Sequence, residues 1–203
     1  ARFAAENHGC EVTGITISEE QKKYADAHCA NLPVQILLQD YREIDGEYDA
    51  IVSVGMLAHV GPKNYRTYME TVKRCLKEDG LFLCHTITGN EQRHLCDRWI
   101  SRYIFANSTL PSVAQVLQAA EGLFVDEDMH NLGPYYVPTL RAWEAGFMRS
   151  REEYRLRYGE EFVRMWRLYL LSCSGAFRAR SMQVFQFLFS ANGVPTSHPL
   201  RLS

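Results

Sequence analysis

Polar side chains that could bind a ligand or take part in a reaction follow four apolar segments of the sequence, at the points where β-strands are expected to end. In an open α/β sheet, ligands bind beyond the carboxyl ends of the strands. Asp40 can accept a hydrogen bond from an exocyclic amine, and Tyr41 offers an aromatic face to a planar base. The pattern therefore favours a cleft that binds an adenine-containing ligand. The four segments and their side chains are 16–21 with Gln21, 39–42 with Asp40, 55–61 with His59, and 85–89 with His85.

Each of these residues also has a structural explanation that needs no ligand. A carboxylate after a strand is more often a helix cap or a turn residue, and a lone histidine at a strand end is more often a hydrogen-bonded structural group. A nucleotide site of the Rossmann type also needs a glycine-rich turn after its first strand. None of the 13 glycines belongs to a G-x-G-x-x-G pattern. Either the cofactor interpretation is wrong or that turn lies upstream of Ala1.

The elements that would position these side chains alternate between strands and helices. A capping box of Ser18 and Gln21 begins a helix that ends at about Ala30, and Pro62 begins a second helix that runs through Leu76. The apolar strands between them argue for a mainly parallel sheet covered by helices. The predicted strands are 12–17, 34–38, 48–54 and 81–87, with a turn at 79–80 before the last of them.

The second half of the sequence is richer in helix. Ser112 and Gln115 form another capping box, which predicts a helix to about Glu121. Further predictions are a strand at 124–130, largely helical structure at 139–178, a closing edge strand at 181–189 and a frayed tail at 192–203. Core packing explains the aromatic stripe between 143 and 170. A solvated helix face explains a cluster of arginines more economically than anionic headgroups do. These arginines are Arg141, Arg149, Arg151, Arg155 and Arg157.

Composition excludes several classes of protein. The chain has 203 residues and a net charge of −2, which argues against a dedicated nucleic-acid binder. Its six cysteines form no C-x-x-C pair and have no zinc-ligand spacing to histidine, so we expect reduced thiols and no metal site. Signal-peptide architecture is absent, and the apolar stretches are far shorter than the ~20 residues that cross a bilayer. We therefore expect a cytoplasmic protein without a transmembrane segment.

Several strings of residues carry a more specific resemblance. They are VTGITISEEQ, ILLQDYREI, IVSVGMLAHVGPKNY, LFLCHTITGN, YIFANSTLPSV, MHNLGPYY and LSCSGAFRAR, in this order. The chain closely resembles cyclopropane-fatty-acyl-phospholipid synthases, which are class I S-adenosylmethionine-dependent methyltransferases related to the mycolic acid cyclopropane synthases. The resemblance implies an α/β, Rossmann-like class I methyltransferase fold, with a mainly parallel sheet and helices on both faces.

The resemblance also implies how the chain is organised. Residues 1–203 would form one partial methyltransferase domain, with a helical insertion around 90–178 that covers the lipid side. Compared with the family, the chain starts in the helix after the first strand, so that strand, its glycine-rich loop and an upstream active-site cysteine would be missing. We therefore expect residues 1–203 by themselves to be nearly inactive.

A reaction follows from the same resemblance. The cis double bond of an unsaturated phospholipid acyl chain attacks the methyl group of S-adenosylmethionine, and the resulting carbocation loses a proton to a bound bicarbonate as the cyclopropane ring closes. By similarity, Thr16, Ile17 and Gln21 contact the methionine or ribose part of the cofactor, and Asp40 and Tyr41 contact the adenosine. Bicarbonate would be held by His85, the backbone of Ile87, and Tyr136. The resemblance also places Ala58 and His59, which follow each other in the sequence, among the catalytic residues.

One position departs from the family pattern. Where the family has a glutamate that accepts the hydrogen bond of the bicarbonate hydroxyl, this chain has Ala58, followed by His59. Bicarbonate binding is therefore in doubt, while cofactor and lipid binding need not be. Two alternatives follow, namely a lipid C-methyltransferase with impaired ring closure and a non-catalytic homologue that binds lipid or a partner. A generic small-molecule methyltransferase ranks last.

The implied partners are unsaturated phospholipid acyl chains at the membrane surface. The protein would be peripheral to the membrane during turnover, and a homodimer is left open. No amphipathic or polybasic stretch of the sequence argues for membrane contact by itself.

Overall fold

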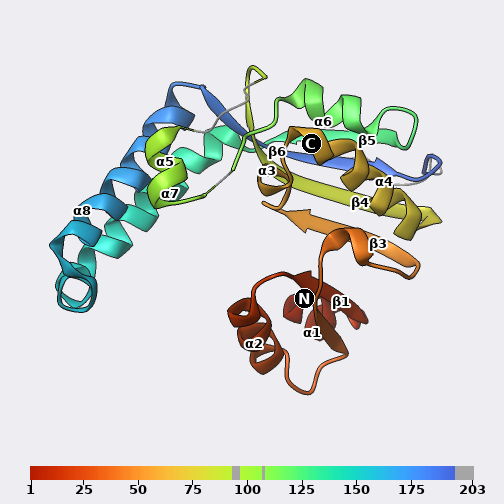
Figure 1. Ribbon diagram of the computed structural model, residues 1–203, viewed down its shortest axis with the longest axis horizontal. Coiled ribbons are helices and arrows are strands. Elements are labelled where there is room, and N and C mark those ends of the chain that lie inside the picture. Colours follow the sequence, from red (N-terminus) through yellow and green to blue (C-terminus); the bar gives the residue numbers. More distant parts are fainter. Residues whose placement is uncertain (93–96, 107, 195–203) are drawn as a thin grey trace. The chain divides into compact units, whose positions relative to one another are not determined.

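The computed structural model describes residues 1–92, 97–106 and 108–194 (Figure 1). The part of the predicted frayed tail from residue 195 onward therefore lies outside the described residues. The described structure divides into two compact units, the first at 1–47 and the second at 48–203.

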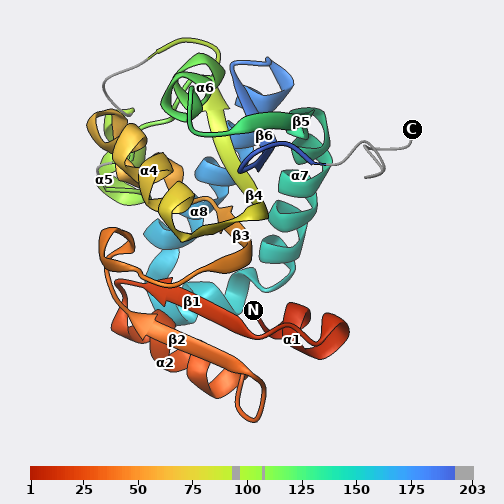
Figure 2. The ribbon, with the colours of Figure 1, turned by 90° about the vertical axis from the view of Figure 1, so that its right-hand side faces the viewer.

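The first unit is a two-stranded parallel sheet with helices. Strands β1 and β2 pair in register from Val12 with Val34 to Thr16 with Leu38, and α2 packs against them (Figure 2). Parallel strands need a crossover connection, and α2 provides it. The elements are α1 (Arg2–His8), β1 (Val12–Thr16), α2 (Glu19–His28), β2 (Val34–Leu38) and a 3-10 turn at Tyr41–Glu43.

Helix α2 begins at the predicted residue, but only half of its capping box forms. The Ser18 side chain is the N-cap and accepts the backbone N–H of Gln21 at 3.3 Å. The Gln21 side chain does not return to Ser18, because its Oε1 accepts the hydroxyl of Thr16 at 2.7 Å. The helix ends at His28, two residues before the predicted end.

The second unit is built on a four-stranded mixed sheet in the order β3-β4-β6-β5. Strands β3 and β4 are parallel, whereas β6 is antiparallel to both of its neighbours. The α/β fold expected from the sequence is confirmed. The elements are β3 (Tyr48–Val54), α3 (Leu57–Val60), a 3-10 turn at Pro62–Asn64, α4 (Tyr65–Cys75), β4 (Leu76–Gly89), α5 (Arg98–Tyr103), α6 (Val113–Ala120), β5 (Val125–Asn131), α7 (Gly133–Arg149), α8 (Arg151–Arg178) and β6 (Met182–Ser190).

Two predictions about strands were wrong. The last strand, β6, is not an edge strand, because it lies between β4 and β5. The predicted turn at Asp79-Gly80 lies inside β4, where the ladder to β3 shifts register. Tyr48 pairs with Leu76 and Ala50 pairs with Leu81, so residues 77–80 are accommodated as an irregularity within the strand.

Two predictions about helices also need correction. The helix predicted from Pro62 through Leu76 is split into the 3-10 turn and α4. The helical segment predicted at 139–178 starts earlier, at Gly133, and is interrupted after Arg149. It is kinked again at Gly159, whose positive φ of 85° is not helical. The capping box at Ser112 and Gln115 is confirmed on both sides.

The sheet of the second unit has helices on both faces. Side chains of neighbouring strands that are directly paired point to the same face. Phe82 of β4 contacts Tyr68 of α4 and Phe189 of β6, with ring centroids 6.2 and 5.7 Å apart. On the opposite face, Ile87 of β4 and Val184 of β6 pack with the α7–α8 hairpin, which extends from one end of the sheet (Figure 1). Strand β4 thus links an aromatic core on one face to the hairpin on the other.

Among the described cysteines, Cys29, Cys75 and Cys84 are buried thiols, as expected of apolar core residues. Cys10 is exposed and Cys173 is partly buried. Cys96 lies outside the described residues.

Gly133, the first residue of α7, is expected to tolerate no side chain. A Cβ there would lie 2.5 Å from Oε1 of Gln183 and 2.9 Å from Oδ1 of Asn131, two side chains that hydrogen-bond each other. We expect Gly133→Ala to lower the free energy of unfolding by about 1–3 kcal/mol, the usual cost of overpacking. Gly146 of the same helix has no neighbour closer than 3.5 Å, so Gly146→Ala should instead be stabilising by up to about 1 kcal/mol.

Urea unfolding followed by tryptophan fluorescence measures both variants, because all three tryptophans belong to the second unit. Equal stability of Gly133→Ala and the unmodified chain would contradict the predicted clash.

Candidate active site and cofactor-binding residues

The two strand ends of the first unit lie side by side, as the sequence predicts. The backbone N–H of Gln39, just after β2, donates to the carbonyl of Thr16 at the end of β1, at 2.9 Å. The Thr16 hydroxyl donates to Gln21 and accepts the N–H of Ser18 at 3.1 Å. The structure therefore brings together Thr16 and Gln21, two of the residues expected at the cofactor. Ile17 lies between them in the sequence and is 82% exposed.

Asp40 forms the structural contacts that the alternative interpretation predicts. Its carboxylate caps the 3-10 turn by accepting the backbone N–H of Arg42, and it also accepts the Nε and Nη2 of that guanidinium at 2.9 and 2.8 Å. These bonds lower the pKa of Asp40 to about 2. Because each carboxylate oxygen has two lone pairs, the side chain keeps the capacity to accept from a ligand. Burial raises the pKa of the neighbouring Tyr41.

In the second unit, His85 lies inside a strand and not at its end. Strand β4 continues to Gly89 because β6 pairs with it over that length, whereas β3 stops at Val54, the residue opposite His85. The His85 side chain is half-buried, and desolvation lowers its pKa below the ordinary value of 6.5. A neutral imidazole at pH 7 can donate one hydrogen bond and accept another.

The backbone N–H of Ile87 is a donor that the end of β3 leaves available. The carbonyl of His85 accepts the N–H of Gly55 at 2.8 Å, so the peptide groups of His85 point toward β3. Backbone groups two residues apart on a strand point to the same side, so the N–H of Ile87 also points that way. Strand β3 has ended by this level, and among the described residues no backbone hydrogen bond joins Ile87 to the segment after it.

Tyr136 reaches the same face of the sheet from α7. It packs in one hydrophobic cluster with Ile87 and Val184, and its ring lies 5.1 Å from that of Phe177 on α8. Strand alternation places His85 on this face as well, two residues before Ile87. The side chains of His85, Ile87 and Tyr136 therefore share one face of the second unit, whereas the backbone N–H of Ile87 points along the sheet toward the β3 side.

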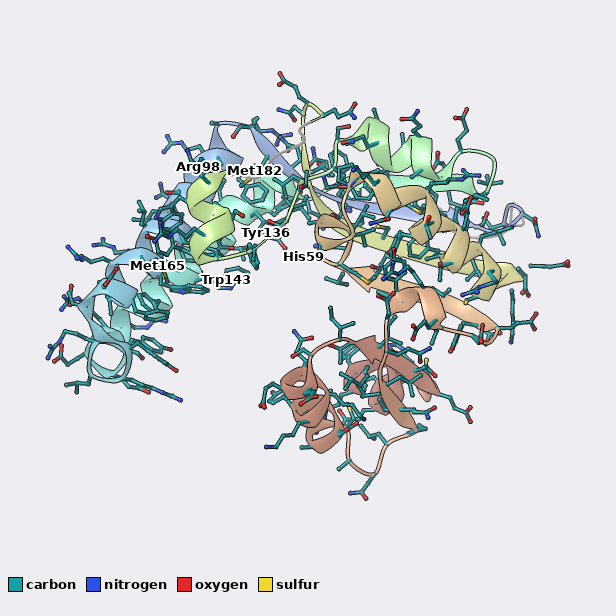
Figure 3. The ribbon with its side chains drawn as sticks, in the orientation of Figure 1. His59, Arg98, Tyr136, Trp143, Met165 and Met182 are labelled. Carbon is teal, nitrogen blue, oxygen red and sulfur yellow. The ribbon has the colours of Figure 1, made fainter. Side chains whose placement is uncertain are left out.

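The short helix α3 positions Ala58 and His59 differently. Ala58 is buried, and its carbonyl accepts the N–H of Thr109 at 2.8 Å. His59 is exposed, with its ring 5.7 Å from that of Phe105 in an edge-on arrangement. Figure 3 shows His59 and Tyr136 on α3 and α7, near the junction of the sheet with the hairpin. The buried methyl group of Ala58 supplies no hydrogen-bonding group.

Two polar residues near His85 are not among the predicted site residues. Gln186 of β6 is paired with His85, and His130 of β5 is paired with Gln186, so the three side chains form a row on one face of the sheet. The sequence signal for Gln186 is its position as the single glutamine within the apolar segment 184–189. The strand order, which the sequence does not reveal, is what brings His130 near.

The lowered pKa of His85 predicts a pH-dependent stability. The unfolded chain takes up a proton at this residue near pH 6.5, whereas the folded chain does so only at a lower pH. The stability that neutral His85 contributes is therefore complete above pH 6.5, the unfolded-state pKa. It is lost as the pH falls toward the folded-state pKa. We expect the free energy of unfolding to decrease as the pH falls from about 7.5 through the ordinary histidine range, and His85→Gln to make this decrease smaller.

Urea titrations at several pH values test this expectation, with His59→Gln as the exposed control. An unchanged pH profile in His85→Gln would contradict it.

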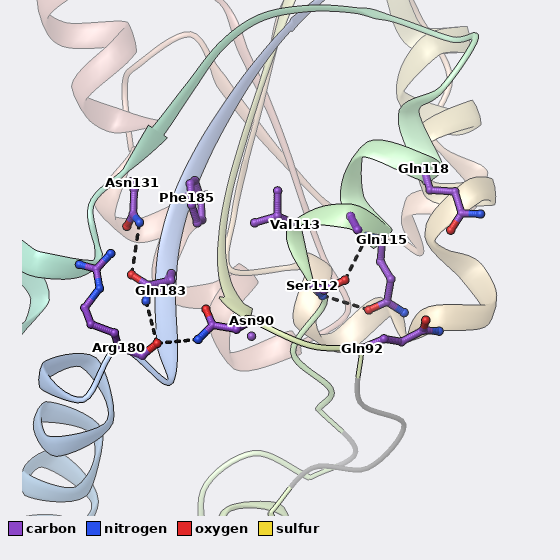
Figure 4. Close-up of a pocket in the computed structure, with 12 residues that line it drawn as sticks. Asn90, Gln92, Ser112, Val113, Gln115, Gln118, Asn131, Arg180, Gln183 and Phe185 are labelled. Atoms are coloured by element: carbon purple, nitrogen blue, oxygen red, sulfur yellow. Dashed lines mark hydrogen bonds between the residues drawn. The ribbon is translucent and has the colours of Figure 1, made fainter.

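A polar pocket of about 470 Å³ lies elsewhere in the second unit, beside the start of α6 (Figure 4). Four of its amide side chains, those of Asn90, Gln115, Asn131 and Gln183, already bond to one another or to backbone, as when Asn90 and Gln183 both donate to the carbonyl of Arg180. None of the predicted site residues lines it. Within the described ranges, no group of three potential ligand side chains is placed to hold a metal ion. No described helix is long and apolar enough to cross a membrane.

Comparison with known families identifies the chain. The family described as mycolic acid cyclopropane synthetase matches residues 1–187. The chain belongs to this family. The resemblance inferred from its sequence strings is thereby confirmed, and the chain is a methyltransferase relative with a Rossmann-like fold.

Two curated relatives of this cyclopropane synthetase chain illustrate the range of similarity. It is 50% identical over 190 residues to the cyclopropane-fatty-acyl-phospholipid synthase of Escherichia coli, covering 94% of this chain and 50% of that protein. It is 33% identical over 199 residues to the tuberculostearic acid methyltransferase UfaA1 of Mycobacterium tuberculosis, covering 92% and 46%. The chain spans about half the length of these two relatives.

Solved structures agree with the family assignment. The mycolic acid cyclopropane synthase CmaA1, complexed with SAH and CTAB, matches with a TM-score of 0.83 at 29% identity, over 92% of this chain and 72% of that one. The cyclopropane synthase MmaA2 of Mycobacterium tuberculosis matches with the same TM-score at 25% identity, over 93% and 72%.

Proposed function

We propose that the complete protein transfers a methylene group from S-adenosylmethionine to the cis double bond of an unsaturated phospholipid acyl chain, forming a cyclopropane ring. The observation that carries this proposal is the shared face of His85, Ile87 and Tyr136, where polar donors border an apolar cluster. The 50% identity to a cyclopropane-fatty-acyl-phospholipid synthase supports the substrate class.

The residues at the strand ends of the first unit fit a nucleoside cofactor. When bound, S-adenosylmethionine supplies an electrophilic methyl group. Thr16, Ile17 and Gln21 would contact its methionine or ribose part, and the hydrogen bond between Thr16 and Gln21 holds these two side chains in place. Asp40 and Tyr41 would contact the adenosine, with Asp40 fixed by the guanidinium of Arg42.

The donors of the second unit fit a small anion. His85 and Tyr136 can donate from side chains, and Ile87 can donate from its backbone N–H, to which the described segment after β3 makes no backbone hydrogen bond. Together they would hold bicarbonate, which accepts the proton as the ring closes. Ala58 adds no acceptor for the bicarbonate hydroxyl, so this part of the site is weaker than in the family pattern.

The α7–α8 hairpin would keep water from the reacting acyl chain. A carbocation exposed to water would be captured by it, so the reaction needs an apolar surrounding. Phe105 links His59 to Tyr169 of α8 by ring contacts of 5.7 and 6.2 Å. These rings and Tyr136 supply such a surrounding next to the donors.

The absence of a carboxylate at the buried position 58 favours a second candidate function. Without a carboxylate at this position, removal of the methyl proton that closes the ring would be slower, and the carbocation would instead lose a different proton to solvent, giving an unsaturated methyl-branched or a methylene product. A non-catalytic homologue is the further alternative. The three candidate functions differ in their product. The cyclopropane synthase makes a cyclopropane, the impaired methyltransferase makes an open-chain methylated lipid, and the non-catalytic homologue makes no product.

Transfer of radiolabelled methyl to cis-unsaturated phospholipid, dispersed in detergent and assayed with the product of the complete gene, tests the proposal. We expect labelled lipid, and mass spectrometry assigns the product. Absence of label above background would sink the enzymatic proposal, and a family-like yield of cyclopropane would reject the impaired variant.

We also infer that turnover takes place at the cytoplasmic membrane surface, because the proposed substrate is a phospholipid acyl chain. A homodimer stays a prediction.

A further inference from the structure

The outer side of α8 carries a regular stripe of exposed residues. Arg164, Leu168, Leu171, Gly175 and Arg178 follow one another at spacings of four and three, so they share one face of the helix. Leu168 and Leu171 expose 53% and 43% of their surface. We call these five residues the outer stripe.

A different face of α8 accounts for the packing of the helix. Val163, Leu170 and Phe177, at intervals of seven, are each 2% exposed and belong to the cluster shared with α7 and β6. The two leucines of the outer stripe are therefore not required by the hairpin core. A Cβ at Gly175 would meet no atom within 4 Å, so the middle of the stripe is open.

The outer stripe itself carries charge of one sign, although Glu160 and Glu161 lie one turn before Arg164, and Glu160 pairs with Arg151. Residues 162–180 contain four arginines and no acidic residue, although the whole chain has a net charge of −2. Arg167 pairs with Glu144 of α7, whereas neither Arg164 nor Arg178 is paired with a carboxylate of the described chain. Two exposed leucines thus lie between two unneutralised arginines, about 21 Å apart along the helix.

A second copy of the chain is a poor occupant for this face. Stripe-on-stripe contact would place arginines against arginines, with no acidic residue in the segment to neutralise them. A partner for this face must neutralise the arginines and accept the leucines. An anionic lipid surface does both, since its phosphates attract arginine and its acyl region accepts leucine.

We propose that the outer stripe of α8 docks the protein onto anionic bilayers. The arginines would contact headgroup phosphates while Leu168 and Leu171 enter the boundary between headgroups and acyl chains. This inference rests on the proposed lipid function and adds to it the surface through which the membrane is reached.

Co-sedimentation with vesicles tests the docking surface. We expect binding to phosphatidylcholine vesicles that contain about one-third phosphatidylglycerol, weak binding to pure phosphatidylcholine, and release as the salt concentration rises from about 0.1 M to about 1 M. Arg164→Glu and Arg178→Glu should each weaken binding about thirtyfold, since each removes a positive charge and adds a negative one. Leu168→Ser with Leu171→Ser should weaken it by a similar factor.

Two control variants make the result specific. Lys63→Glu changes charge by the same amount at an exposed lysine of the turn Pro62–Asn64, and Leu156→Ser removes a leucine that is 75% exposed near the start of α8. Both should bind like the unmodified protein. Equal losses in variants and controls, or no binding to anionic vesicles, would overturn the docking proposal.

The methyl-transfer assay on detergent-dispersed lipid separates this outcome from failure of the proposed function. Labelled product with no vesicle binding rejects the docking surface alone.

Discussion

Replacing Ala58 with glutamate is expected to raise the yield of cyclopropane product about ten- to a hundredfold. This range corresponds to one hydrogen bond to a charged group in a water-poor site, about 1.5–3 kcal/mol. Position 58 is buried at the start of α3, and its backbone is already fixed by the bond from Thr109. A carboxylate there would add the acceptor that the donors His85, Ile87 and Tyr136 do not provide.

The same substitution carries a cost in stability. A carboxylate at a buried position loses hydration unless it finds a hydrogen-bonding partner. We therefore expect Ala58→Glu to unfold at a lower urea concentration than the unmodified protein, even as its ring-closing activity rises. Opposite changes in stability and activity indicate a functional group introduced at a reaction site.

Ala58→Gln is the matched control, because it adds the same bulk without the charge. The measurement is the ratio of cyclopropane to methyl-branched lipid, by mass spectrometry, with the product of the complete gene. If Ala58→Glu and Ala58→Gln give the same ratio as the unmodified protein, Ala58 is not the reason for any deficit in ring closure.

Truncation of Phe82 to alanine is expected to lower the free energy of unfolding of the second unit by about 3–5 kcal/mol. Phe82 is fully buried on β4, and its ring lies 5.9 Å from Phe124 and 5.7 Å from Phe189. Its removal leaves a cavity between α4 and the sheet that the neighbouring rings cannot fill without leaving their rotamers.

Tyr135→Ala is a suitable control, since this ring of α7 is 64% exposed and should cost less than about 1 kcal/mol. Urea unfolding followed by tryptophan fluorescence measures both. A loss in Phe82→Ala no larger than in Tyr135→Ala would show that the aromatic cluster does not stabilise this sheet.

Phe82 also lies on the same strand as His85, three residues earlier and on the opposite face. A partly destabilised Phe82→Leu variant should therefore reduce activity mainly through the folded fraction of the protein. The rate per folded molecule should change little, because the variant leaves the donor face of β4 intact.

Local sequence patterns determined much of this protein. The alternation and β-branching of 12–17, 34–38 and 48–54 gave strands within one residue of those observed, because they reflect backbone preference and burial over a few positions. Ser112 and Gln115 specified the start of α6, since both halves of that box lie within one turn. The resemblance in motif strings identified the family, which the comparisons confirmed.

Only the tertiary structure decided which groups meet. Within the described residues, the segment after β3 makes no backbone hydrogen bond to Ile87, because β3 ends before β4 does. His130 joins the row of His85 because β6 lies between their strands. Asp40 is engaged by Arg42, and Gln21 bonds to Thr16 and not to its own helix cap. Strand order depends on contacts across the fold. The choice among competing hydrogen-bond partners depends on side-chain geometry even between residues two to five positions apart, and short-range periodicity records neither.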